Sequence, residues 1–231
     1  MTKNDRTIAL LGDNNFKIIQ NATVAVIGLG GVGGYAVESL ARIGIKRLIL
    51  VDYDDIDITN INRQIIATND NIGLKKVDEF IKRINLIDPN IEIISLKIKL
   101  NQENYYQLFK YKFDYLIDAC DDITAKQIII LECLKRNTKF IMSMGTGNKL
   151  HPELLEITEL SKTAYDPIAK KLRKFVKENN IKDKIIVVSS KEKIIKKENN
   201  IVSSISFLPS VAGLLCTSYI INDILKNNSK T

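Results

Sequence analysis

An α/β fold built on a doubly wound, mostly parallel sheet is predicted by three observations. Short runs rich in Val, Ile and Leu, typical of strands buried on both faces, alternate with longer segments of helical periodicity. A glycine-rich turn, Gly28 to Gly33, joins the first such run to the first long helical segment. Polar residues gather directly after several runs, which is where ligands of doubly wound sheets bind.

The elements of the first half follow in chain order. Residues 1–22 are expected to form an amphipathic helical arm that Gly12 divides; its packing positions would be Ile8, Leu10, Leu11, Phe16, Ile18 and Ile19. The expected strands are residues 24–27, 48–51, 91–98, 114–119 and 139–144. The expected helices are residues 33–43, 73–88, 102–109 and 124–136. Residues 53–71 are dense in Asp and Asn, which predicts an irregular loop.

The second half is expected to extend the sheet and cover one of its edges. Residues 154–160 and 184–190 are predicted strands, and residues 167–177 a basic helix. Residues 191–200 are polar enough for a mobile loop, and residues 205–225 form an apolar closing helix. We therefore expect a single domain: an arm (1–22), a core (23–150) and an extension (151–231).

Composition favours a folded protein of a reducing compartment. The chain has 231 residues, 45% of them hydrophobic and 26% charged. Its three cysteines contain no C-x-x-C pair, so neither a disulfide framework nor a zinc ribbon is indicated; they are Cys120, Cys133 and Cys216. No secretory signal sequence is evident at the N-terminus. The apolar stretch 211–225 contains Asn222 and Asp223, and we expect it to be too short to span a bilayer.

The positive charge is concentrated in one segment. The formal net charge is +7, and residues 162–197 hold 12 Lys or Arg against 4 Asp or Glu, an excess of +8. A localised basic segment indicates a polyanionic partner, such as nucleic acid or an anionic membrane surface. A solvated lysine-rich face is the alternative, because lysine blocks are common on protein surfaces.

The glycine turn predicts a nucleotide site in a Rossmann-like sheet. Gly28, Gly30 and Gly33 form G-x-G-x-x-G, which lets backbone approach a phosphate before a helix opens. Asp52 ends the second strand, where a carboxylate can accept ribose hydroxyls. A dehydrogenase would also need its own catalytic group, yet the only histidine, His151, lies in a predicted loop. The motif alone does not fix which nucleotide binds.

The polar residues around the strand ends favour nucleotidyl transfer over hydride transfer. They are Asp54, Asn60, Asn62, Arg63, Gln64, Lys76 and Asp121. Arginine and lysine can hold a triphosphate, and carboxylates can hold a magnesium ion.

These residues resemble a known family, the ATP-dependent adenylating enzymes related to ubiquitin activation and to sulfur-carrier activation in thiamine and molybdopterin synthesis. The resemblance rests on G-L-G-G-V-G (28–33), V-D-Y-D (51–54), N-I-N-R-Q (60–64), G-L-K-K (73–76) and I-D-A-C-D (117–121). It implies catalytic roles for Arg63 and Lys76 on the phosphates, and for Asp121 beside Mg²⁺. The implied ATP-binding residues are Gly28, Gly30, Gly31, Gly33, Asp52 on the ribose, Asp54, Asn60, Asn62 and Gln64.

The second half resembles the branch that dehydrates N6-threonylcarbamoyladenosine in tRNA. The matching segments are S-M-G-T-G-N-K-L-H-P-E (143–153), L-S-K-T-A-Y-D-P-I-A-K-K-L-R (160–173), S-S-K-E-K (189–193) and S-I-S-F-L-P-S-V-A-G (204–213). In that reaction ATP adenylates the threonyl carboxylate, and the carbamoyl group of the same side chain attacks, closing a ring and releasing AMP. No enzyme thiol is needed, so we expect Cys120 to be a packing residue. The implied tRNA-binding residues are Lys170, Lys171, Arg173, Lys174 and Lys177.

Three other functions remain open from the sequence. Relatives that activate ubiquitin-like carriers often have paired C-x-x-C zinc motifs or a thioester cysteine in a long insertion, and this chain has neither, so no zinc is expected. A sulfur-carrier adenylating enzyme, a non-catalytic nucleotide-binding regulator and an NAD-dependent oxidoreductase are the alternatives. The resemblance also implies a cytoplasmic homodimer whose arginines can reach the neighbour's ATP site, and a sulfur-relay partner.

Overall fold

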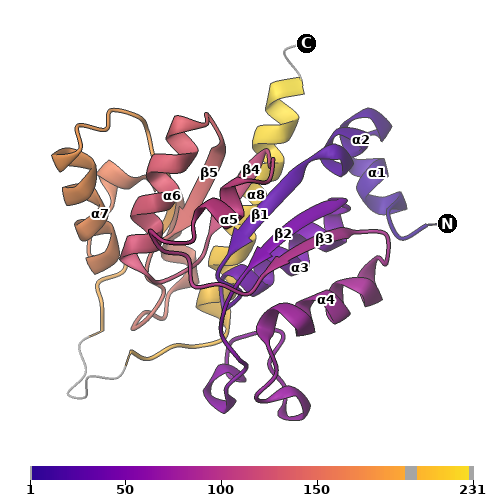
Figure 1. Cartoon of the computed structure of the whole chain (residues 1–231), viewed down its shortest axis with the longest axis horizontal. Coiled ribbons are helices and arrows are strands. Elements are labelled where there is room, and N and C mark those ends of the chain that lie inside the picture. The colour runs from indigo at the N-terminus through magenta and orange to yellow at the C-terminus, as the bar shows by residue number, and fades with distance from the viewer. Residues whose placement is uncertain (1, 196–201, 229–231) are drawn as a thin grey trace.

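The computed structural model describes residues 2–195 and 202–228, and within them a single seven-stranded sheet forms the centre of the molecule (Figure 1). The strand order is β3-β2-β1-β4-β5-β7-β6, and neighbouring strands are parallel except for the antiparallel pair β6 and β7. The strands are β1 (Thr23–Ile27), β2 (Arg47–Val51), β3 (Glu92–Leu96), β4 (Tyr115–Asp118), β5 (Lys139–Ser143), β6 (Leu155–Glu159) and β7 (Ile186–Ser190). The predicted doubly wound sheet is confirmed, as is its extension by strands of the second half.

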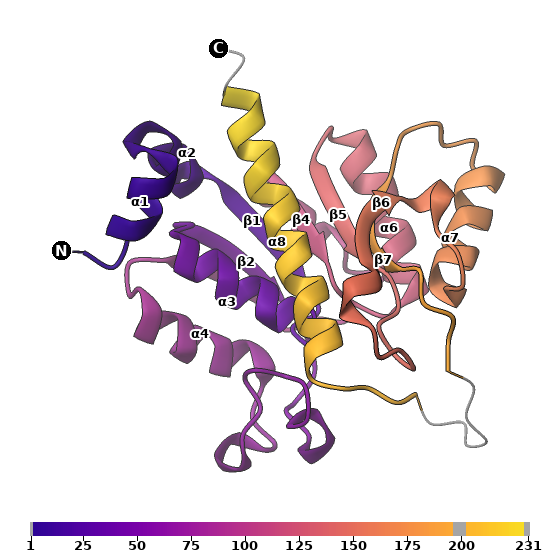
Figure 2. The same ribbon diagram turned by 180° about the vertical axis from the view of Figure 1, so that it is seen from behind.

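Helices cover both faces of the sheet. They are α1 (Asp5–Leu11), α2 (Asp13–Asn21), α3 (Gly33–Ile43), α4 (Lys76–Ile87), α5 (Tyr106–Phe109), α6 (Ile123–Lys135), α7 (Pro167–Glu178) and α8 (Phe207–Asn228). Figure 2 shows α3, α4 and α8 in front of one face, and Figure 1 shows α5 and α6 in front of the other. Short 3₁₀ helices lie at Ile58–Asn60, Asn69–Asn71, Pro152–Leu154 and Leu160–Lys162.

Alternation along the strands divides the apolar residues between two cores. Val24 and Val26 of β1 pack with α3 and α8, whereas Ala25 and Ile27 belong to the core beneath α5, α6 and α7. Because side chains alternate across a strand, a central strand must be apolar on both faces. The composition of residues 24–27 was therefore a sound signal for a central strand.

Several predicted boundaries were wrong. The helix expected from residue 73 begins at Lys76, because residues 73–75 belong to the turn that returns Lys75 to an isolated bridge with Asp55. The helix expected at 102–109 is confined to Tyr106–Phe109. Leu10, an expected packing residue, is 83% exposed. Part of the predicted mobile loop, residues 196–200, lies outside the described residues.

The apolar part of the closing helix is longer than the stretch 211–225 predicted above. Within the described residues, α8 includes one 20-residue segment, Phe207–Lys226, that is long and apolar enough to cross a membrane, so its predicted shortness was wrong. Half of that segment is buried inside the protein, where α8 packs on α3 and β5. A core helix meets the same length and hydropathy criteria, so this is weak evidence for a membrane span.

Candidate active site

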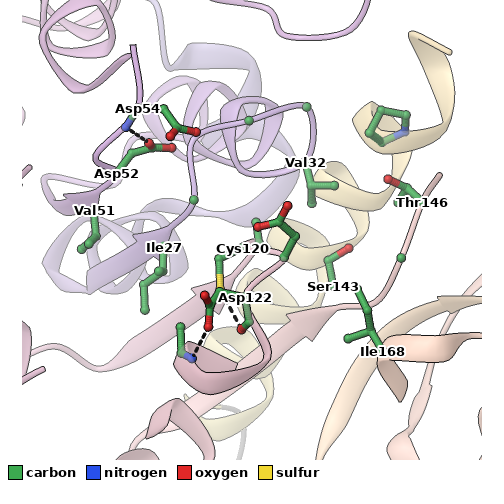
Figure 3. A pocket seen from close by; sticks show the side chains of 18 of the residues that line it. Ile27, Val32, Val51, Asp52, Asp54, Cys120, Asp122, Ser143, Thr146 and Ile168 are labelled. Carbon is green, nitrogen blue, oxygen red and sulfur yellow. Dashed lines mark hydrogen bonds between the residues drawn. The ribbon is translucent and has the colours of Figure 1, made fainter. Parts of the chain in front are cut away.

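A pocket of about 520 Å³ opens at the carboxyl ends of β1, β2, β4 and β5. Its lining brings together predicted site residues from separate loops: Gly28, Gly30, Gly31, Asp52, Asp54, Arg63, Lys76 and Asp121. Asp52 and Asp54 lie on one side of it, and Ser143, Thr146 and Ile168 lie on the other (Figure 3). Parallel strands end at one edge of the sheet, which is why residues so distant in sequence meet here.

Glycine is required at two positions of the glycine turn, residues 28–33. Gly28 has φ +81°, and a Cβ there would lie 2.8 Å from the backbone nitrogen of Cys120. A Cβ on Gly33 would lie 1.8 Å from the carbonyl oxygen of Gly28. Gly33 begins α3 and does not line the pocket among the described residues. Its role is to let the helix start close against the turn, so that backbone N–H groups face the pocket.

Asp52 and Lys76 form the charged side of the pocket. The Asp52 carboxylate accepts hydrogen bonds from the backbone N–H groups of Leu29 (2.6 Å) and Asp54 (2.8 Å), one at each oxygen. Burial raises the pKa of Asp52, and the charge of Lys76 opposes that rise. Lys76 starts α4, is itself buried, and lies 2.8 Å from Oδ2 of Asp54. Carboxylate and ammonium thus stand on one wall, suited to hydroxyl and phosphate groups respectively.

Of the N-I-N-R-Q segment, only Arg63 lines the pocket among the described residues. Nη1 of Arg63 donates to the carbonyl oxygen of Thr59 and to Oδ1 of Asn62, both at 2.9 Å. Asn62 also donates to the carbonyl oxygen of Ser204 at 3.2 Å. The bonds of Nη1 hold one side of the Arg63 guanidinium group in place. The bond from Asn62 connects the Arg63 loop to the segment before α8.

Asn60 and Gln64 support the site from within the protein. The Asn60 side chain accepts a hydrogen bond from the backbone N–H of Asp57 in a capping box, so it shapes the turn before Arg63. Gln64 is buried beneath the glycine turn, where a Cβ on Gly30 would lie 3.7 Å from its Nε2. Its buried Oε1 makes no hydrogen bond within the described part of the chain.

Asp121 is exposed at the mouth of the pocket, on the turn that follows β4. Among the described residues no group of three or more His, Cys, Asp or Glu side chains could hold a metal ion unaided. Mg²⁺ is usually held by one or two carboxylates together with substrate phosphates. In the described part of the chain, Asp121 is one of four aspartates in the pocket lining, and its exposed carboxylate near the glycine turn fits Mg²⁺ that arrives with a nucleotide.

Cys120 lines the pocket as a neutral thiol. Its Sγ lies 3.0 Å from Oδ1 of Asp118, which also accepts from the Cys120 backbone N–H at 3.1 Å. Burial, followed by the charge of Asp118, raises the pKa of Cys120 well above its ordinary value. A thiol in this environment is a poor nucleophile, because the thiolate is the reactive form.

The sequence did not predict the buried ion pair between Lys126 and Asp118, which lies beneath the pocket. Nζ of Lys126, on α6, lies 2.9 Å from Oδ2 of Asp118 and 2.9 Å from the carbonyl oxygen of Ser143. It therefore ties the end of β4 to the end of β5. The available signal was a lysine between the apolar residues of 123–135, at a position that helical periodicity turns toward the sheet.

The helix of predicted tRNA-binding residues begins beside the pocket. Ile168, in the first turn of α7, lines it, and Lys170, Lys171, Lys174 and Lys177 are exposed further along the helix. Arg173 differs: it is half-buried and its Nη1 donates to the carbonyl oxygen of Thr163 at 2.9 Å and to the Thr163 hydroxyl. Arg173 thus anchors the segment before α7. His151 is exposed, pairs with Glu153 at 2.7 Å and does not line the pocket among the described residues.

Comparison with known proteins agrees with this geometry. The sequence model of the ThiF family matches residues 3–231. A tRNA threonylcarbamoyladenosine dehydratase of Bacillus subtilis is 42% identical over 94% of this chain and 92% of its own length. The Escherichia coli protein of that name is 36% identical over 74% of this chain and 64% of its own length. A crystal structure of the E. coli enzyme in complex with ATP superposes with a TM-score of 0.93, at 29% identity, covering 99% of this chain and 96% of that one.

Proposed function

This chain belongs to the ThiF family, and from that premise we propose that it dehydrates N6-threonylcarbamoyladenosine in tRNA at the expense of ATP. The observation that carries the proposal is the convergence of Asp52, Arg63, Lys76 and Asp121 in one pocket from which a lysine-rich helix departs. The 42% identity to a B. subtilis tRNA threonylcarbamoyladenosine dehydratase over nearly the whole chain supports this substrate.

The proposed first step is adenylation of the threonyl carboxylate. A carboxylate oxygen attacks the α-phosphorus of ATP, the bond from that phosphorus to the bridging oxygen breaks, and pyrophosphate leaves. Each Asp52 oxygen already accepts one backbone N–H bond, which orients the carboxylate to accept the ribose hydroxyls with its remaining lone pairs. Arg63 and Lys76 would stabilise the negative charge that builds on the phosphates.

The proposed second step closes a ring within the substrate. The carbamoyl group attacks the activated carbonyl carbon, the bond to the AMP oxygen breaks, and one proton is lost. The sum of both steps removes one water molecule from the side chain. Protonated Cys120 supports a route without a thioester, because burial raises the pKa of its thiol.

Asp121 would help to hold a Mg²⁺ ion that arrives with ATP, and that ion would offset phosphate charge. Asp121 is exposed and near the glycine turn, which supports that role. We propose that Asn60, Asn62 and Gln64 act as the framework of the ATP site, since their bonds and burial hold the Arg63 loop and the glycine turn. Zinc is not part of the proposal.

We propose that the enzyme acts in the cytoplasm as a homodimer, as the family resemblance implies, and that a sulfur-relay protein is a further candidate partner. Cytoplasmic conditions suit its three free thiols, two of which are buried. Light scattering of the purified protein at micromolar concentration should give twice the monomer mass of 26.1 kDa. A monomeric mass would contradict the dimer.

One assay separates the candidate functions. Pyrophosphate and AMP release should be measured with tRNA carrying N6-threonylcarbamoyladenosine, with a small sulfur-carrier protein, and with neither. Release only with the modified tRNA, together with a tRNA mass loss of one water molecule, is the expected result. AMP transfer to the carrier's C-terminal glycine would favour the carrier-activating alternative. Binding of ATP without release of pyrophosphate would favour a non-catalytic regulator. Reduction of NAD, measured separately, would favour an oxidoreductase.

A further inference from the structure

Asp166 connects the lysine-rich helix to the pocket wall. It is the N-cap of α7, and its Oδ1 accepts a hydrogen bond from the backbone N–H of Ala169 at 2.8 Å. Its Oδ2 accepts one from the backbone N–H of Gly145 at 2.9 Å. One carboxylate, only 3% exposed, is therefore shared between the start of α7 and a residue that lines the pocket.

Buried Lys149 closes this connection into a ring. Its Nζ donates to the carbonyl oxygen of Gly145 at 2.7 Å and lies 3.4 Å from Oδ2 of Asp166. Both peptide groups of Gly145 are thus held, the N–H by Asp166 and the carbonyl by Lys149. A Cβ at Gly145 would lie 2.9 Å from Oδ2 of Asp166, so the approach is as close as glycine allows.

The far end of this turn, residues 148–151, bonds to two segments that lie outside the helices and strands. The backbone N–H of Asn148 donates to the carbonyl oxygen of Ser203, and the Glu192 carboxylate accepts from the backbone N–H groups of Leu150 and His151 at 2.9 Å. Gly145 is therefore a residue through which α7 connects to this turn. Residues 145–147 line the side of the pocket opposite Asp52, away from the ribose and phosphate contacts proposed above.

We propose that Asp166 is a positioning residue that couples RNA docking on α7 to the shape of the Gly145–Gly147 wall, where the acyl group must meet ATP. The inference rests on the proposed function. RNA bound to the exposed lysines of α7 fixes that helix, and Asp166 transmits its position to the turn. Asp166 touches neither ATP nor tRNA in this scheme, so its loss should change turnover and leave binding intact.

Asp166→Asn tests the coupling because asparagine keeps an oxygen for the Ala169 N–H. Its amide NH₂ would then face the Gly145 N–H and Lys149, both donors, so the cap survives while the link to the turn is lost. We expect the rate of AMP formation at saturating ATP and modified tRNA to fall by about tenfold to 100-fold. The dissociation constants for ATP and for tRNA should stay within about twofold of wild type.

Two control variants distinguish coupling from a loss of folded protein. Asp88→Asn removes another buried aspartate that pairs with two lysines, Lys3 and Lys46, but lies at the opposite end of the sheet. It should lower the melting temperature without lowering turnover per folded molecule. Asp166→Asn combined with Lys149→Met removes the unpaired buried charge, so it should recover melting temperature but not turnover.

Hydrogen exchange gives a second readout that does not depend on catalysis. Modified tRNA should slow amide exchange of residues 145–147 in the ATP-saturated wild type, and it should not do so in Asp166→Asn. Wild-type turnover in Asp166→Asn, a uniform loss that tracks the melting temperature, or equal protection in both proteins would overturn the coupling. A wild type that forms no AMP with modified tRNA would instead refute the proposed function, and the exchange measurement would still decide the coupling.

Discussion

Nζ of Lys126 lies 2.9 Å from Oδ2 of Asp118, and both side chains are completely buried beneath the pocket. Burial opposes the charge of Lys126, but Asp118 outweighs it, so the pKa of Lys126 lies above its ordinary value. Because the ammonium group also reaches the Ser143 carbonyl, this pair holds the ends of β4 and β5 together.

Removing Lys126 should therefore cost much stability. Lys126→Met leaves Asp118 buried without its partner, and the free energy of unfolding should fall by about 3–5 kcal/mol in urea titrations. The double variant with Asp118→Asn should recover part of that loss. Lys135→Met, an exposed lysine on the last turn of the same helix, should change stability by less than about 0.5 kcal/mol. Equal effects of the two lysine variants would contradict a structural role for Lys126.

Lys76 and its neighbour Lys75 should differ sharply in catalysis. Lys76→Met removes an ammonium from the pocket, so kcat/KM for AMP formation should fall by about 10²–10³-fold. Lys75→Met is the matched control, because Lys75 pairs with Asp55 at 2.6 Å and does not line the pocket among the described residues. Circular dichroism should show both variants folded. Comparable activity in the two would remove Lys76 from the proposed mechanism.

Charge reversal on α7 should weaken tRNA binding. Lys170 and Lys171 are exposed near the helix start that borders the pocket, so Lys170→Glu with Lys171→Glu should raise the dissociation constant for tRNA. The slope of log affinity against log salt should decrease by about 0.7–0.9 for each phosphate that the variant no longer neutralises. ATP affinity should not change.

The matched control for this pair is Lys17→Glu with Lys112→Glu. These lysines are also exposed, but they lie on α2 and before β4, at the opposite end of the sheet from the pocket. The control changes net charge equally, so a similar loss of tRNA affinity would show that overall charge matters and the position of α7 does not.

Asp88 should make stability depend on pH in acid. Burial alone would raise its pKa, but hydrogen bonds from Lys46 and Lys3 outweigh burial and hold the pKa below its usual range. A depressed folded-state pKa stabilises the protein above the unfolded value of about 4, and this contribution is lost as pH falls below it. The stability difference between wild type and Asp88→Asn should thus shrink by at least about 1 kcal/mol between pH 7 and pH 2. A pH-independent difference in urea unfolding would argue against this ion pair.

The sequence predicted those parts of the site whose structure depends on residues close together in the chain. The turn from Gly28 to Gly33 and the end of strand β2 at Asp52 depend on neighbouring residues, so composition and spacing were sufficient. The sequence predicted Asn60 and Gln64 as ATP-binding residues, and their bonds and burial place them behind the pocket lining. A motif indicates candidate residues in a loop, but it does not indicate which of their side chains line the pocket.

The buried charges could not be predicted in the same way. Lys126 and Lys149 find their partners 8 and 17 residues away, across a change of element. A lysine in a sequence usually indicates an exposed side chain. Only the folded structure shows that a buried carboxylate lies beside these two lysines. The prediction that Leu10 is a packing residue was wrong for the opposite reason. An amphipathic pattern in a short helix does not show whether another element covers its apolar face.

The joint between β5 and β7 has a consequence for how such a protein can diversify. These strands pair through two residue pairs, Met142 with Val187 and Ser143 with Val188, whereas β1 and β2 pair through five. Strands β1, β2 and β4 carry Gly28, Asp52 and Asp121 at their carboxyl ends, whereas β6 and β7 lie beyond this joint. Because so few residue pairs cross it, we expect β6 and β7 to tolerate rearrangement with little effect on β1 to β5. The helix α8 packs on β4 and β5 as well as on β6 and β7, so any such rearrangement must still fit against it.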